Sequence, residues 1–334
     1  MKIITLNPPF FKRFSRESRS PAVAKSGTLY YPMWLAYATG VLEKAGHEVS
    51  LIDAPAAGHD TAETVRLISS ASPGLIIMNT STPSIDNDLK VAEEIKKSSP
   101  DSVLCMVGTH VSALPEETVM RSDAVDLAAF GEYDYTVRDL AARISEGTPW
   151  KDLKGICYRE NEKAVKNPPA DPVTDLDELP FVSEVYKKHL DISDYFYGHS
   201  RHPIMVFVTG RGCPHRCTYC VMPQTMHGHA YRTRSEENVA EEFKYVCDNF
   251  PEVKEIMIED DTFTINKKRA ARIAELIIQK KADRIPWSAN SRADVDLETM
   301  KTLHKANCRL FCVGFESGSQ EILDNIKKKT ELNR

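Results

Sequence analysis

Three cysteines stand close together in the second half of this 334-residue chain, in the segment Cys213-Pro-His-Arg-Cys217-Thr-Tyr-Cys220. Three thiolates on one loop can bind three irons of a cubane cluster, whereas iron–sulfur proteins that only carry electrons normally use four cysteines. The missing fourth ligand leaves one iron open to an exogenous molecule. A zinc site usually takes four protein ligands, or three and a water. His215 is available as a fourth zinc ligand, but its place inside the loop makes simultaneous ligation awkward. The spacing therefore favours a cluster with one open iron.

The remaining cysteines do not indicate a disulfide framework. They are scattered, and most of them stand in apolar runs. Because the chain is long and shows no secretory signal, we interpret them as small buried side chains. They are Cys105, Cys157, Cys247, Cys308 and Cys312.

The composition is that of an ordinary globular protein, with 42% hydrophobic and 27% charged residues. The formal net charge of −5 gives no general attraction to nucleic acid, so no nucleic-acid partner is expected. No window holds about 18 consecutive apolar residues, so no membrane-spanning helix is expected. The opening residues MKIITLNPPF lack the features of a signal peptide and predict the first strand of a cytoplasmic protein.

The cysteine loop lies in a region where apolar strands and amphipathic helices alternate. Ser235 is a good N-cap for the helix that follows the loop, and the lysine run at 327–329 is typical of a solvated helix end. Because each strand is followed by a helix, the strand ends should gather at one edge, where β/α barrels place their active sites. The expected strands are 204–209, 253–258, 286–289 and 309–315, and the expected helices are 236–249, 267–281, 297–306 and 320–327.

Residues 1–145 show the same alternation and predict a doubly wound α/β domain with a parallel sheet. Their apolar runs are near-continuous, as in strands that are covered on both faces. Ligands of such sheets bind beyond the carboxyl ends of the strands. The expected strands are 2–6, 48–53, 75–79, 103–107 and 126–130, and the expected helices are 33–45, 61–70, 85–97, 115–121 and 133–145.

Residues 146–200 differ from both flanking regions. They predict a hairpin, 155–159 with 163–167, followed by an acidic stretch that four prolines interrupt. We interpret this region as a linker with little core of its own. The sequence thus predicts three parts, 1–145, 146–200 and 201–334.

The cysteine segment resembles the radical S-adenosylmethionine (SAM) superfamily, including the aromatic residue before the last cysteine, Tyr219. The resemblance implies a [4Fe–4S] cluster on Cys213, Cys217 and Cys220, with the amino and carboxylate groups of SAM on the open iron. It also implies reductive cleavage of the sulfonium to a 5′-deoxyadenosyl radical that abstracts hydrogen from a substrate. The protein's task would be to position the sulfonium and exclude water.

The ends of the next strands carry side chains that the same resemblance assigns to SAM. Asp260 and Asp261 resemble the acidic segment that reaches the SAM amino group, although an acidic pair also suits a helix N-terminus. Ser288, Asn290 and Arg292 lie where the family places polar groups for the ribose and carboxylate. Arg292 suits a carboxylate clamp, and the alternative is a surface salt bridge.

The last expected strand ends in Gly314-Phe-Glu316-Ser-Gly318, which resembles the family's GxESG segment. The resemblance implies that Glu316 approaches the ribose or the substrate, and we treat it as the candidate catalytic residue. Arg232 and Arg234 are expected either to pair with a phosphate or acidic substrate or to lie on a solvated helix entry.

The first domain resembles the cobalamin-binding domain of radical SAM proteins. The residues that carry this resemblance follow four expected strands, and they are Asn7, Thr80, Ser81, Gly108, His110, Gly131 and Glu132. The D-x-H-x-x-G signature that supplies a histidine to cobalt is replaced by Asn7-Pro-Pro-Phe10. If cobalamin binds here, we expect no ligation from that histidine.

The whole layout implies an enzyme that methylates or rearranges an unactivated carbon of a small molecule or lipid, with cobalamin as methyl carrier. It resembles radical SAM proteins of hopanoid side-chain tailoring, so a lipid-linked substrate is included, and a flavodoxin- or ferredoxin-type protein is the expected electron donor. The alternative is a non-catalytic corrinoid- or metal-binding fragment of a longer enzyme. Radical SAM cores usually form six βα units, and only four are readable here. We therefore expect a chain truncated at its C-terminus, with an incomplete barrel and an unpaired edge at 309–315.

Overall fold

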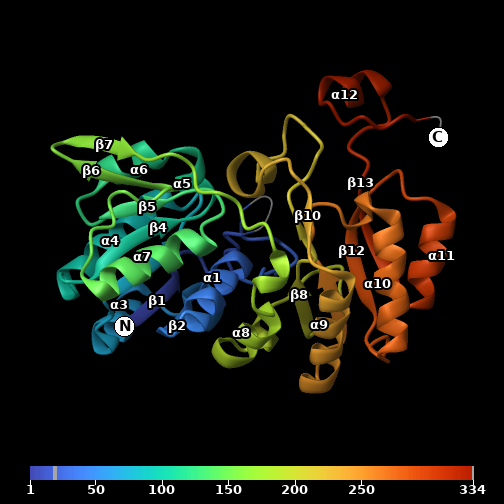
Figure 1. Cartoon of the computed structure of the whole chain (residues 1–334), viewed down its shortest axis with the longest axis horizontal. Coiled ribbons are helices and arrows are strands. Elements are labelled where there is room, and N and C mark those ends of the chain that lie inside the picture. The colour runs from blue at the N-terminus through green and yellow to red at the C-terminus, as the bar shows by residue number, and fades with distance from the viewer. Residues whose placement is uncertain (18–20, 333–334) are drawn as a thin grey trace. The chain divides into compact units, whose positions relative to one another are not determined.

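The near-continuous apolar runs of the first half of the chain form one seven-stranded sheet in the order β2-β1-β3-β4-β5-β6-β7 (Figure 1). The computed structural model describes residues 1–17 and 21–332. β1 to β5 are parallel, and β6 and β7 are antiparallel additions. The strands are β1 (Lys2–Asn7), β2 (Glu48–Asp53), β3 (Leu75–Asn79), β4 (Val103–Val107), β5 (Leu127–Ala129), β6 (Ile156–Glu160) and β7 (Lys163–Lys166).

Helices cover both faces of this sheet. On one face, Ile4 and Leu6 of β1 pack in a cluster with Leu89, and on the other Thr5 bonds the hydroxyl of Thr39 at 2.7 Å. Because both faces are filled, the strand ends remain as the place for a ligand. The helices are α1 (Met33–Lys44), α2 (Ala54–Ala57), α3 (Thr61–Ala71), α4 (Ile85–Ser98), α5 (Thr109–Ala113), α6 (Pro115–Arg121), α7 (Asp134–Glu146) and α8 (Val182–His189).

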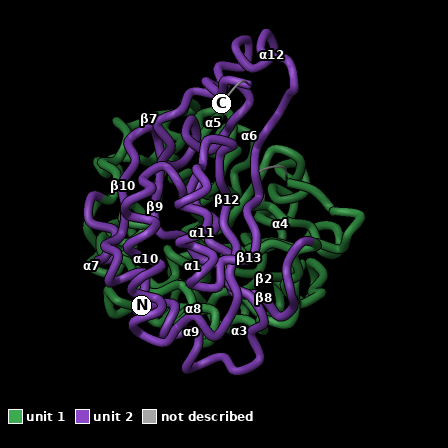
Figure 2. The backbone as a smooth tube through the Cα atoms, turned by 90° about the vertical axis from the view of Figure 1, so that its right-hand side faces the viewer, with its two compact units in different colours: residues 1–173, 179–198 green, residues 174–178, 199–334 purple. Residues whose placement is uncertain are grey.

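The region expected to be a linker, 146–200, is mostly part of this first unit. The unit comprises residues 1–173 and 179–198 (Figure 2). The hairpin extends the sheet beyond β5. Its apolar residues Ile156 and Cys157 are fully buried there. α8 packs against α1. The linker interpretation therefore underestimates how much core these residues supply.

The second unit, residues 174–178 and 199–334, is built on a four-stranded parallel sheet in the order β13-β12-β11-β8. Each strand precedes a helix, as the alternating pattern predicts. A two-stranded ribbon, β9 with β10, stands beside it. The elements are β8 (Ile204–Phe207), β9 (Gly210–Arg211), β10 (Arg232–Thr233), α9 (Glu236–Asn249), β11 (Glu255–Ile258), α10 (Lys267–Gln279), β12 (Trp287–Arg292), α11 (Leu297–Lys305), β13 (Cys308–Gly314) and α12 (Gln320–Asn325).

Aromatic side chains fill the core of the second unit. Phe243 meets Phe207 and Trp287 edge to face, with ring centroids 5.2 and 5.9 Å apart. Such pairs contribute roughly 0.5–1.5 kcal/mol each beyond their buried area. Ser235 caps α9 through a bond from the Asn238 amide, as expected. This packing fixes the strands whose carboxyl ends carry the cysteine loop.

The fold class predicted from the sequence is confirmed, since the expected strands and helices are present with ends displaced by a few residues. β13 is the last strand in its sheet, and most of its side chains are half-exposed. Within residues 1–17 and 21–332, no helix has both the length and the hydropathy to cross a membrane.

Candidate functional site

The cysteine loop is closed at its base by the β9–β10 ribbon. Gly212 precedes the first cysteine with a φ of +83°, and a Cβ there would lie 2.2 Å from the carbonyl oxygen of Ala230. Only glycine fits such a left-handed, crowded position. The amide of Cys213 donates to the Gly228 carbonyl at 3.3 Å, and the His229 ring lies 3.0 Å from the Cys213 carbonyl oxygen. The loop therefore leaves β9 and returns to β10 in a fixed conformation.

The three predicted ligands lie together in this loop. None of the three is part of a disulfide; Cys213 is 9% exposed, and Cys217 and Cys220 are half-buried. Burial raises the pKa of Cys213, and the nearby Asp261, Cys220 and Cys217 raise it further. The Cys220 amide donates to the Cys217 carbonyl at 3.2 Å, so the second and third cysteines share one turn of the loop.

The donor set suits a cubane cluster. In the described residues, no three His, Cys, Asp or Glu side chains gather closely enough to hold one metal ion. A cubane places each thiolate on a different iron, so its cysteines need not meet at one point. Three thiols on one closed loop, with polar strand ends around them, fit a cluster that keeps one iron open.

Asp260, expected to reach the SAM amino group, is turned inward. Its carboxylate accepts bonds from the Thr209 amide at 2.5 Å, the Thr209 hydroxyl at 2.6 Å and the Gly210 amide at 3.2 Å. It is 1% exposed, and burial raises its pKa. Asp261, the next residue, is half-buried and acts on the pKa of Cys213. Asp260 thus holds the segment between β8 and β9, and Asp261 lies nearer to the cysteines.

Two buried arginines, Arg269 and Arg234, hold the segments that lead into and out of the cysteine loop. Arg269 donates to the Thr209 hydroxyl at 3.1 Å and to the carbonyl oxygens of Thr209 and Arg234 at 2.8 and 2.9 Å. Arg234 pairs with Glu242 at 2.5 Å, and both side chains are almost fully buried. The expectation of a substrate contact or solvated helix entry for Arg234 is therefore wrong. Its charge is used inside the unit, because a buried guanidinium needs a partner.

The polar residues of β12 differ in burial and in the groups that they contact. Ser288 is fully buried, and its hydroxyl donates to the sulfur of Met257 at 3.2 Å. Asn290 is half-buried and donates to the Asp260 carbonyl at 3.1 Å. Arg292 is 5% exposed and donates to the Lys328 carbonyl at 2.5 Å. Arg292 Nε also lies 3.8 Å from a carboxylate oxygen of Asp294, whose side chain is 58% exposed, so the alternative of a salt bridge is present too.

Glu316 follows β13 and binds Lys328, a residue that no sequence motif indicates as part of the site. It adopts a left-handed φ of +64° and binds the Lys328 ammonium group at 2.7 Å. The same ammonium group donates to the hydroxyl of Tyr219 at 3.2 Å. Tyr219, between the second and third cysteines, is otherwise half-exposed. The interpretation of the lysine run as solvated is wrong for Lys328, and no local sequence signal distinguishes it from its neighbours.

In the first unit, the residues expected to bind cobalamin do lie at the carboxyl ends of β1, β3, β4 and β5. Several are already bonded within the protein. Asn7 donates to Asp53 at 2.7 Å, and Thr80 donates to Asp88 at 2.8 Å. Ser81 and Ser84 share a hydroxyl–hydroxyl bond of 2.9 Å. These residues shape the edge of the sheet.

The other members of the same set differ in how much room they leave for a ligand. His110 is 3% exposed, and its Nδ1 lies 3.2 Å from the Thr82 hydroxyl, while its buried Nε2 has no hydrogen-bond partner in the part of the chain that the structure describes. Gly131 has a φ of +75° and open space where a Cβ would be. Gly108 has a φ of +111° and would place a Cβ 2.4 Å from Asn79 Oδ1 and Thr80 O. Glu132 is buried beside this edge. A buried polar atom without a partner and open space beside a glycine are features that a bound polar cofactor would use.

A buried ion pair connects the loop after β1 to helix α4, which follows β3. No local sequence pattern indicates it. Arg16 Nη2 lies 2.6 Å from Asp88 Oδ1, with both side chains 0% exposed. Arg16 also donates to Asn7 Oδ1 at 3.1 Å. Glu17, next in sequence, accepts amide bonds from Trp34 and Leu35 at the start of α1, and burial raises its pKa to about 8. The bonds of Arg16 and Glu17 hold the loop after β1 at the carboxyl edge of the sheet.

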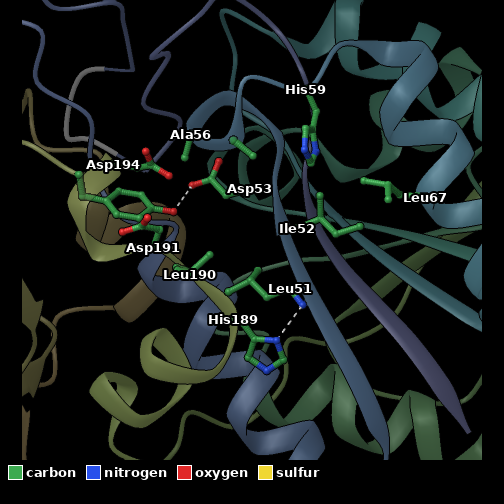
Figure 3. A pocket seen from close by; sticks show the side chains of 12 residues that line it. Leu51, Ile52, Asp53, Ala56, His59, Leu67, His189, Leu190, Asp191 and Asp194 are labelled. Atoms are coloured by element: carbon green, nitrogen blue, oxygen red, sulfur yellow. Dashed lines mark hydrogen bonds between the residues drawn. The ribbon is translucent and has the colours of Figure 1, made fainter. Parts of the chain in front are cut away.

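A pocket of about 230 Å³ opens at the end of β2 (Figure 3). Asp53 faces it, bonded to Asn7 on one side and to the Tyr195 hydroxyl at 2.8 Å. Burial raises the pKa of Asp53 to about 6 despite these bonds. The other lining side chains include His59, His189, Asp191 and Asp194. All residues that line the pocket belong to the first unit, and Asp53 connects the pocket to Asn7.

Comparisons with known proteins give each unit a family. A family model described as the radical SAM superfamily matches residues 207–334. A second, described as the B12 binding domain, matches residues 19–141. The first match falls on the unit with the cysteine loop, and the second falls on the unit with the seven-stranded sheet.

Two relatives match almost the whole chain. An uncharacterized methyltransferase of Pyrococcus horikoshii is 31% identical over 330 residues, which cover 98% of this chain and 68% of that protein. The anaerobic magnesium-protoporphyrin IX monomethyl ester cyclase of Synechocystis is 25% identical over 342 residues, which cover 100% of this chain and 65% of that protein. The chain thus spans about two thirds of the length of these relatives.

A solved structure shares the fold. The radical SAM methyltransferase TsrM from Kitasatospora setae, with cobalamin and a [4Fe–4S] cluster bound, matches with a TM-score of 0.77 and 19% identity over 98% of this chain and 60% of that chain. The fold, the cysteine loop, both family models and the P. horikoshii relative agree. The chain belongs to the radical SAM proteins that carry a B12-binding domain.

Proposed function

We propose that this chain carries the cluster, SAM and cobalamin sites of a radical SAM enzyme. The observation that supports it most is the group of three thiols outside any disulfide, Cys213, Cys217 and Cys220, in a loop closed by the β9–β10 ribbon. When bound, a [4Fe–4S] cluster with an open iron supplies the electron that cleaves the SAM sulfonium to a 5′-deoxyadenosyl radical. The protein supplies the ligands, the orientation and a dry site.

The residues around the loop divide into two roles in this proposal. Asp261, Asn290, Arg292, Glu316 and Tyr219 bind or orient SAM, and Glu316 extends toward the substrate. Asp260 and Ser288 instead support the loop and the strand from below, because both are buried and bonded inside the unit. Arg292 presents a planar guanidinium group that matches a carboxylate.

Cobalamin would bind at the carboxyl edge of the first sheet. We assign the buried His110 Nε2, the open space beside the Gly131 Cα and the buried Glu132 to contacts with the cofactor. Asn7, Thr80, Ser81 and Gly108 shape the edge itself, since their polar groups or glycine conformation are already committed to protein contacts. Bound cobalamin would supply a methyl group to a carbon radical.

The substrate class that suits this chemistry is a small molecule or lipid-linked molecule with an unactivated carbon. Methylation is the simplest outcome, and rearrangement or ring formation uses the same radical. The names of the two relatives, a methyltransferase and a cyclase, include both kinds of outcome. A flavodoxin- or ferredoxin-type protein would deliver the electron. The cysteines of the loop are not in disulfides, which suits the reducing cytoplasm.

The first test is anaerobic reconstitution with iron and sulfide, followed by incubation with SAM, a strong reductant and methylcobalamin. We expect iron–sulfur absorption and formation of 5′-deoxyadenosine. S-adenosylhomocysteine in addition would identify a methyl transfer, and 5′-deoxyadenosine alone would identify a rearrangement. A chain that holds iron and cobalamin but leaves SAM intact would instead be a binding module.

The second test concerns the lower face of cobalamin. The chain should bind hydroxocobalamin, and the Co(II) form should show no nitrogen hyperfine structure from a protein imidazole, because Asn7-Pro-Pro-Phe10 stands in place of the histidine signature. Electron paramagnetic resonance on protein labelled with ¹⁵N-histidine measures it. Hyperfine coupling that changes with the label would contradict this expectation. The His110→Ala variant is the matched sample, since His110 should affect affinity and leave the cobalt spectrum unchanged.

A further inference from the structure

Lys328 is the one lysine of the run at 327–329 that is buried. It is 5% exposed, whereas Lys327 and Lys329 are exposed. Both neighbours adopt left-handed backbone conformations, with φ of +56° and +54°. Such conformations are uncommon outside glycine and persist where surrounding structure requires them. The left-handed residues on either side of Lys328 thus accompany a side chain that lies inside the unit.

The buried ammonium group lies against the cysteine loop. It binds Glu316 Oε1 at 2.7 Å and the Tyr219 hydroxyl at 3.2 Å, and it lies 5.9 Å from the centroid of the Tyr219 ring. The backbone is fastened to the same loop, because the Thr218 amide donates to the Ile326 carbonyl at 3.1 Å. Arg292 holds the other side through the Lys328 carbonyl. These bonds connect the lysine to the turn between the second and third cysteines.

Stability alone does not account for this arrangement. Burying the Lys328 ammonium group costs desolvation that its attraction to the partly exposed Glu316 only partly offsets, and the two left-handed residues add strain. An ammonium group beside thiolates has a direct electrostatic effect, because a positive charge stabilises the more negative state of a neighbouring group. Tyr219 directly precedes Cys220, whose amide donates to the Cys217 carbonyl at 3.2 Å, so the ammonium group that binds the Tyr219 hydroxyl contacts the turn that carries both cysteines.

We propose that Lys328 is a positioning residue of the cluster site, which anchors the Cys217–Cys220 turn through Tyr219 and raises the reduction potential of the bound [4Fe–4S] cluster. The inference rests on the proposed function. Removing the charge should make the reduced cluster less stable. Removing the charge of Glu316, which offsets that of Lys328, should have the opposite effect.

The test is a spectroelectrochemical titration of the reconstituted full chain without SAM. Lys328→Met should lower the reduction equilibrium constant about tenfold, or ~59 mV for one electron, and Lys328→Arg should restore most of it. Lys327→Met removes the same charge from an exposed neighbour and should leave the potential close to that of the wild type, because solvent and salt screen it. Glu316→Gln should raise the potential, and it serves as a second variant if Lys328→Met fails to fold.

The outcomes separate the two proposals. A wild-type cluster whose potential is unchanged in Lys328→Met, or in Glu316→Gln where the former does not fold, overturns the role of Lys328 alone. Equal shifts in Lys328→Met and Lys327→Met also overturn it, since burial would then be irrelevant. A wild-type chain that assembles no cluster overturns the proposed function, and this inference with it.

Discussion

Replacing Cys213, Cys217 and Cys220 together with alanine is expected to abolish the visible iron–sulfur absorption of the chain after anaerobic reconstitution. The three thiols lie in one loop outside any disulfide, and no other three cysteines stand as close together in the sequence. A thiolate is the form that binds a metal. Without these three ligands, the iron has no preformed donor set. Iron and sulfide analysis and the absorption spectrum measure the loss.

The matched control replaces three other cysteines, Cys105, Cys247 and Cys308, with alanine. Burial raises the pKa of Cys105 and of Cys308 to about 12, so these thiols stay protonated and are poor ligands. The control chain should keep its cluster, and far-ultraviolet circular dichroism should show both variants folded. A SAM-responsive [4Fe–4S] signal that survives in the Cys213/Cys217/Cys220 variant would refute the ligand assignment.

The parallel sheets were predictable because their signal is local. β3 (Leu75–Asn79) is buried at every position, and its sequence is correspondingly apolar without alternation. The cysteine spacing is also local, and it predicted the loop that the structure closes with β9 and β10. Helix α9 begins at its predicted cap because the Ser235 hydroxyl and the Asn238 amide are three residues apart.

The contacts that the sequence did not predict depend on distant partners. Arg16 and Asp88 are 72 residues apart, and Lys328 and Tyr219 are 109 apart. A charged side chain in a polar segment is usually solvated, so nothing local indicates that these are buried. The hairpin β6–β7 was recognised, but its pairing with β5 was not, because a short apolar run does not identify the edge that it joins.

The buried pair of Arg16 and Asp88 leads to the second large effect. Arg16→Met should cost roughly 3–5 kcal/mol of stability, because it leaves the Asp88 carboxylate buried without its cation. Both side chains are 0% exposed, and Asp88 also accepts hydroxyl bonds from Thr80 and Ser84. Hydroxocobalamin affinity should fall as well, because Arg16 holds Asn7 at the cofactor edge. Amide hydrogen exchange of β1 and β3, read by mass spectrometry, measures the change within the first unit.

Two further variants decide whether the buried charge is the cause. Arg66→Met removes an arginine from an exposed pair with Glu63, whose side chains are 63% and 40% exposed, and should change stability by about 1 kcal/mol or less. Arg16→Met with Asp88→Asn removes both charges and keeps an oxygen acceptor for the Thr80 and Ser84 hydroxyls, so it should regain most of the lost protection. If Arg16→Met is no less protected than Arg66→Met, the pair does not hold the edge. If the double variant is no better than Arg16→Met, the loss comes from packing of the arginine side chain and not from an unpaired carboxylate.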